Sequence, residues 1–121
     1  MAYEMHWVKG PTEGDDVEEF ARRSRFSASD SMMASLRHEM EQQGMIDPDR
    51  IPAIKLEGPG QLVTPEEVQA ALHRSNMNPG SPLHKIPQEE WRKGWEAWLE
   101  FLSGAAQNQY GGFTVRHATL H

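Results

Sequence analysis

The chain of 121 residues has the length of one domain and is long enough to bury a single hydrophobic core. It contains no cysteine, which excludes disulfides, thiolate zinc sites and thiol nucleophiles. The net charge is −6 at pH 7, and residues 1–50 hold eleven of the eighteen acidic residues. Because contacts to phosphate need clustered lysine and arginine, we expect no direct binding of nucleic acid.

The sequence shows no membrane-directed segment. The first ten residues include Glu4, His6 and Lys9, so they lack the apolar centre of a signal peptide. No apolar run approaches the ~20 residues that a membrane-spanning helix needs. We therefore expect a soluble, cytoplasmic protein that forms one domain over residues 1–121.

The N-terminal part of the sequence predicts one strand and two helices. Apolar and polar residues alternate over residues 3–8, which is typical of a strand with one buried face. Residues 15–24 predict a short helix that is capped by one of its two leading aspartates. The polar residues 27–31 offer capping oxygens for a second helix, which should end at Gly44 in a left-handed cap.

The middle of the sequence predicts an edge strand, a well-capped helix and a loop. Residues 51–56 favour a short strand, which Pro52 restricts to a sheet edge or a bulge. Residues 64–67 supply a threonine N-cap, a proline at the first helical position and a glutamate at the third. This third helix should reach about Arg74. The turn-rich residues 76–82 then predict a connecting loop.

The strongest pattern in the chain is a tryptophan stripe within residues 87–102. Trp91, Trp95 and Trp98 lie at helical spacing, so a helix places them on one face that must be buried. Gly94 stands between them and suggests the close approach of another part of the backbone. We favour burial in the chain's own core. The alternative is an intermolecular contact, because tryptophan is enriched among interface anchors.

The C-terminal part of the sequence predicts a helix end and a closing strand. Gly104 should end the tryptophan helix, and residues 107–112 have the composition of a flexible linker. Alternation over residues 113–120 predicts a strand. The expected fold class is α+β, with about four helices packed with a small antiparallel sheet that includes the N- and C-terminal strands.

The sequence contains no complete catalytic motif, so we expect no catalytic residues and no cofactor. The leading hypothesis is a small acidic, non-enzymatic protein-binding module of the inhibitor, immunity or adaptor type, from a bacterium or a phage. Glu18 and Glu19 could steer such a module toward a basic protein partner. The tryptophan stripe of Trp91, Trp95 and Trp98 would then anchor the partner.

Two other functional classes remain open. His73 and His84 flank the predicted loop, and with Glu89 they could hold a divalent metal that activates water. That arrangement would suit a metal-dependent hydrolase or nuclease, whereas the plainer interpretation is that both histidines are exposed and have no specific role. The third class is a structural or assembly component of a larger particle, since the sequence does not set the oligomeric state.

Overall fold

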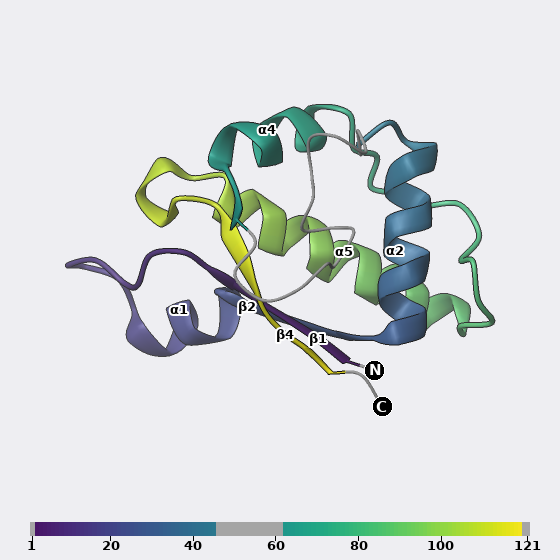
Figure 1. Ribbon diagram of the computed structural model, residues 1–121, viewed down its shortest axis with the longest axis horizontal. Helices are drawn as coiled ribbons and strands as arrows, with labels where there is room; N and C mark the ends of the chain where they lie inside the picture. Colours follow the sequence, from purple (N-terminus) through teal and green to yellow (C-terminus); the bar gives the residue numbers. More distant parts are fainter. Residues whose placement is uncertain (1, 46–61, 120–121) are drawn as a thin grey trace.

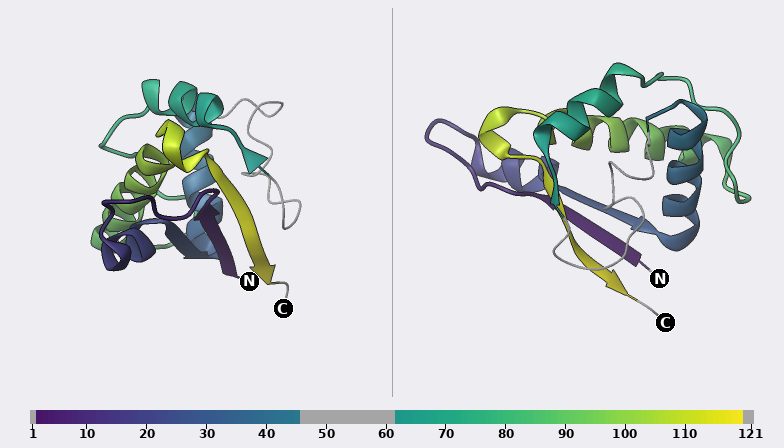
Figure 2. Two further views of the ribbon diagram at one scale, coloured as in Figure 1. Left: turned by 90° about the vertical axis from the view of Figure 1, so that its left-hand side faces the viewer. Right: turned by 45° about the horizontal axis from the view of Figure 1, so that its top comes forward.

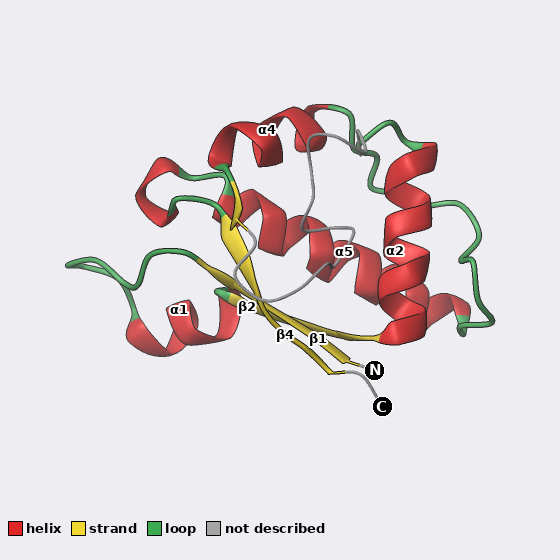
Figure 3. Cartoon of the chain, viewed as in Figure 1, coloured by secondary structure: helices red, strands yellow, loops and turns green. Residues whose placement is uncertain are grey.

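The computed structural model describes residues 2–45 and 62–119 of the chain, which form four α-helices and a four-stranded antiparallel sheet (Figures 1 and 3). This confirms the α+β class. The strand predicted for residues 51–56 lies outside the described residues. No helix in the described ranges is long and apolar enough to span a bilayer. The elements are β1 (Ala2–Trp7), α1 (Val17–Arg23), β2 (Arg25–Ser29), α2 (Asp30–Gln42), β3 (Leu62–Val63), α4 (Pro65–His73), α5 (Gln88–Ala105), the 3-10 helix η1 (Asn108–Tyr110) and β4 (Phe113–Thr119).

The sheet has the strand order β2-β1-β4-β3, so the last strand lies between β1 and β3. Met5 of β1 pairs with Phe26 of β2, and Trp7 of β1 pairs with Phe113 of β4. All four of these side chains are buried. Figures 1 and 2 show α2, α4 and α5 on one side of the sheet, and this is the side where the hydrophobic core forms.

Three of the four described helices begin where the sequence places a capping side chain, and α5 begins after Pro87 without one. Asp16, Ser29 and Thr64 are the N-cap residues of α1, α2 and α4, and each accepts a hydrogen bond from a backbone N–H of the first turn. Pro65 follows Thr64 as the first residue of α4. Gly44 has a φ of 74° just after α2, which is the left-handed conformation expected of it.

The tryptophan stripe of α5 is buried inside the chain itself. Trp91, Trp95 and Trp98 are almost fully excluded from solvent and belong to the main hydrophobic core. A buried indole N–H without an acceptor would cancel much of the gain from burying the ring, and each of the three N–H groups has an acceptor. The acceptors are the carbonyl of Gly80 for Trp91 (2.8 Å), the carbonyl of Asn76 for Trp95 (2.8 Å) and the sulfur of Met40 for Trp98 (3.0 Å).

Two segments differ from the sequence prediction. The polar residues before α2 do more than cap that helix, because Arg25–Ser29 forms the edge strand β2 and buries Phe26. The segment 107–112 is not simply a linker. It contains η1, and Tyr110 of that turn is buried against the ring of Trp7.

Both glycines of α5 have a role other than the predicted one. Gly104 does not end the helix, which continues to Ala105. A Cβ atom at position 104 would overlap the indole of Trp7, so this glycine makes room for the ring. Gly94 faces the thioether of Met32 in α2, and not another stretch of backbone.

The connection between α4 and α5, residues 75–87, has no regular secondary structure, yet its backbone is held at regular intervals. We call it the α4–α5 loop. Three of its backbone N–H groups, spaced four residues apart, donate to three side chains of α2 and its C-cap that are also spaced four residues apart. The pairs are Asn76 to Gln43 (2.6 Å), Gly80 to Glu39 (3.0 Å) and His84 to Ser35 (3.2 Å). Because residues at this spacing share one helix face, a single polar row of α2 fixes the loop.

Candidate functional site

Carboxylates gather at the start of α1, where local hydrogen bonds fix two of them. Oδ1 of Asp16 accepts the backbone N–H groups of Glu18 (3.0 Å) and Glu19 (3.1 Å). Oδ2 of Asp15 accepts from the backbone N–H (2.8 Å) and the hydroxyl (3.1 Å) of Thr12. These bonds explain why the chain turns into the helix at this point. The side chains of Glu18 and Glu19 are exposed, as the sequence analysis expects of a steering surface.

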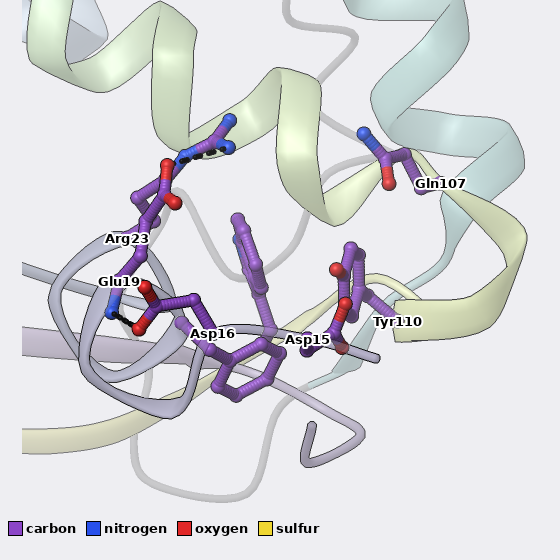
Figure 4. Close-up of a pocket in the computed structure, with 8 residues that line it drawn as sticks. Asp15, Asp16, Glu19, Arg23, Gln107 and Tyr110 are labelled. Carbon is purple, nitrogen blue, oxygen red and sulfur yellow. Dashed lines mark hydrogen bonds and ion pairs between the residues drawn. The ribbon is translucent and has the colours of Figure 1, made fainter. Parts of the chain in front are cut away.

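A small pocket of about 110 Å³ adjoins these carboxylates (Figure 4). Its walls come from β1, from α1 with the turn before it, and from the segment that follows α5. One part of the lining is acidic and another part is aromatic. The lining residues are Trp7, Asp15, Asp16, Glu19, Phe20, Arg23, Gln107 and Tyr110.

The aromatic part of the pocket is a packed cluster. Trp7 stacks on Tyr110 with 4.4 Å between the ring centroids, and Phe20 meets Trp7 edge to face at 5.4 Å. The indole N–H of Trp7 donates to the carbonyl of Phe101 in α5 at 3.0 Å. Trp7 and Tyr110 are buried and Phe20 is half-buried. The cluster therefore gives the pocket a rigid wall.

Arg23 is a cationic side chain in the pocket lining, and its contacts to carboxylates are long. Its Nη1 lies 3.8 Å from Oε1 of Glu19, and its Nε lies 3.8 Å from Oε1 of Glu100 in α5 (Figure 4 labels the first pair). Both distances exceed those of hydrogen bonds, and exposed pairs of this kind contribute little to stability. Arg23 therefore offsets only part of the negative charge that Asp15, Asp16 and Glu19 bring to the pocket.

The tryptophans predicted as partner anchors are core residues in this structure. Trp91, Trp95 and Trp98 have side chains that are at most 2 % exposed. The favoured interpretation, burial in the chain's own core, therefore describes the stripe in this structure. A partner surface built from the same rings would require the core to open.

The structure does not gather the residues of the predicted metal site into a ligand cluster. His73 ends α4, His84 lies in the α4–α5 loop, and Glu89 lies in the first turn of α5; all three side chains are exposed. Glu89 forms an ion pair with Lys93 at 3.4 Å. Within residues 2–45 and 62–119, no three histidine, aspartate or glutamate side chains are placed to hold a metal ion. The metal site thus stays a prediction without structural support.

No local sequence pattern predicts the aromatic wall of the pocket. Trp7, Phe20 and Tyr110 come from three distant parts of the chain, so no local pattern connects them. One signal was available: Trp7 lies on the same face of the predicted strand as Met5, which indicates that its ring is buried against another part of the chain.

Comparison of the chain with protein-family models, with curated proteins and with solved structures found no match. Any functional argument must therefore start from the residues of the chain itself.

Proposed function

We propose that this chain is a non-enzymatic protein-binding module, of the inhibitor, immunity or adaptor type, whose acidic α1 surface recognises a basic partner. The observation that carries the proposal is the pocket beside α1. There, the carboxylates of Asp15, Asp16 and Glu19 adjoin the packed rings of Trp7 and Tyr110. Exposed Glu18 extends the same negative surface toward solvent.

This combination of groups suits a lysine or arginine side chain of a partner. Carboxylates attract the cation over a distance of about 10 Å at ordinary ionic strength, which speeds association. Trp7 and Tyr110 are buried and serve as a rigid backing, so half-buried Phe20 is the ring that such a cation could approach closely. The long contact of Arg23 leaves the carboxylate of Glu19 available for a second cation.

The proposal predicts that association depends on the charge of α1. The immobilised chain is used to capture a partner, which is identified by mass spectrometry and purified. In a Glu18→Ala/Glu19→Ala variant, we expect its association rate constant to fall about tenfold at low salt and to depend less on salt. Stopped-flow measurements over a salt series provide the test.

The chain offers a matched control for this experiment. Glu89 and Glu90 also form an acidic pair in the first turn of a helix, α5, and that turn lies at the end of the molecule opposite α1 (Figure 1). A Glu89→Ala/Glu90→Ala variant changes the net charge by the same amount. If both double variants slow association equally, only net charge matters and the α1 surface has no special role. An unchanged rate in the α1 variant would also contradict the proposal.

A further inference from the structure

The outward side of the α4–α5 loop exposes apolar side chains on a fixed backbone. Met77 and Leu83 are 60 % and 53 % exposed, although large apolar side chains are costly to leave in water. The backbone beneath them is held on two sides. α2 accepts the N–H groups of Asn76, Gly80 and His84, and the indoles of α5 donate to the carbonyls of Asn76 and Gly80.

These inward bonds have two consequences for recognition. A loop that is already ordered loses little conformational entropy when a ligand binds, so its exposed side chains are preorganised. The N–H groups of Asn76, Gly80 and His84 are occupied, so they are not free to pair with a partner strand. At these three positions a ligand can meet only the side chains and carbonyl groups of the loop.

Two hollows lie side by side on this surface. The first, of about 650 Å³, is lined by residues 78–82 together with Ile86, Gln88, Trp91 and Arg92. The second, of about 620 Å³, is lined by residues 82–87. Pro82 and Ile86 line both hollows and are half-buried, so they form an apolar boundary that the hollows share.

Each hollow has one cationic side chain in its lining. Arg92 belongs to the first hollow and Lys85 to the second, and both are exposed. Within the described part of the chain, neither forms an ion pair, whereas neighbouring Lys93 is paired with Glu89. Two cations beside exposed apolar groups are a distinct feature on a chain whose net charge is −6.

We infer that the α4–α5 loop is a second docking surface, which takes an acidic, apolar peptide segment of a partner protein. Apolar side chains of the peptide occupy the two hollows, and its carboxylates meet Arg92 and Lys85. A nucleic acid fits less well, because two cations neutralise few phosphates and leave Leu83, which lines the second hollow, without an apolar partner. The surface goes beyond the proposed function, since a chain with an acidic site at α1 and a basic site at the loop can join two partners.

The test uses the full chain and random 12-residue peptides displayed on phage. We expect selected peptides to be rich in aspartate or glutamate and in large apolar residues. A synthetic peptide of the consensus sequence should shift the amide NMR signals of residues 76–87. Arg92→Glu should weaken its binding about tenfold, whereas Lys93→Glu, the same charge change at the next position, should leave affinity within about twofold. Leu83→Ser, at an exposed position that folding tolerates, should also weaken it severalfold.

Several outcomes would overturn the inference. They are the absence of any enriched peptide, a basic consensus whose NMR shifts fall on α1, or equal effects of Arg92→Glu and Lys93→Glu. Binding of an oligothymidine that depends on Lys85 and Arg92, without peptide binding, would assign the surface to nucleic acid instead. A basic consensus peptide that binds α1 would support the proposed function of α1 and contradict the docking surface on the α4–α5 loop. The failure of one proposal can therefore be distinguished from the failure of the other.

Discussion

Two glycines of α5 lie in different surroundings, although both belong to the same helix. The position of Gly104 is filled on its outer side by the rigid indole of Trp7, which is itself fixed by a hydrogen bond to the carbonyl of Phe101. Gly94 faces the flexible end of Met32, whose sulfur and methyl carbon would lie 2.8 Å from an added Cβ. A thioether can rotate away, whereas a packed indole cannot move without disturbing its neighbours.

We predict that Gly104→Ala destabilises the protein and that Gly94→Ala does not. Overpacking against Trp7 should lower the free energy of unfolding by about 2 kcal/mol, and the helix preference of alanine offsets little of this loss because position 104 lies in the last turn of α5. At Gly94 the same helix preference should roughly cancel the cost of moving Met32, which leaves stability within about 1 kcal/mol of the parent. Urea denaturation measures both. Equal stabilities of the two variants would mean that the indole does not occupy the space beside Gly104.

At the scale of elements, hydrogen bonds to α2 hold the α4–α5 loop in place, although the loop has no regular secondary structure. Glu39 is the central member and is buried. One carboxylate oxygen accepts from the N–H of Gly80 and the other from the side-chain amide of Gln43 at 2.8 Å. Removing an acceptor leaves its donors without partners, which costs more than the bond itself contributes.

Glu39→Ala should therefore loosen the loop more than it destabilises the whole fold. We expect a loss of about 1 kcal/mol in global stability. The amide hydrogens of Gly80 and its neighbours should exchange with solvent much faster, because their protection depends on this contact. Hydrogen exchange followed by NMR gives the residue-level measurement. Glu41→Ala, which removes an exposed carboxylate paired with Arg37 at 3.5 Å, serves as the control and should leave loop exchange unchanged.

The elements that could be predicted from the sequence are those with a local signal. The tryptophan spacing predicts α5, the Thr64-Pro65 cap predicts α4, and alternation predicts β1 and β4; the structure confirms each of these elements. β2 is harder to recognise, since its five residues include an arginine and two serines and only Phe26 is fully buried.

For the functional surfaces, only the exposure of Glu18 and Glu19 could be predicted locally. The other residues of the pocket, such as Trp7 and Tyr110, are distant in the sequence and are brought together by tertiary packing. The polar row on α2 was missed for a related reason. Ser35 and Glu39 look like solvent-exposed helix residues until a loop from a distant part of the chain covers them.

At the scale of the whole molecule, the core contains all four tryptophans of the chain. Trp7 enters it from the sheet, whereas the other three enter from α5, and none is more than 5 % exposed. A core connected in this way across the sheet and the helices should unfold as one cooperative unit.

We predict a single unfolding transition seen by two probes. Tryptophan fluorescence should be blue-shifted in the native protein and should move to longer wavelength at the same urea concentration at which helical circular dichroism is lost. Collisional quenching by iodide should be weak before the transition and strong after it. A strongly quenched indole in the native protein, or two separate transitions, would contradict the burial of the stripe in α5.

The place of β4 in the sheet has a consequence for how the protein is made. This strand is the last element of the described residues, yet it forms the hydrogen bonds that join β1 to β3. During synthesis, the four described helices and the strands β1, β2 and β3 leave the ribosome before the strand that completes their sheet. The nascent chain must therefore keep its growing apolar surface from aggregating until residue 119 has emerged, and the native core closes only after that point.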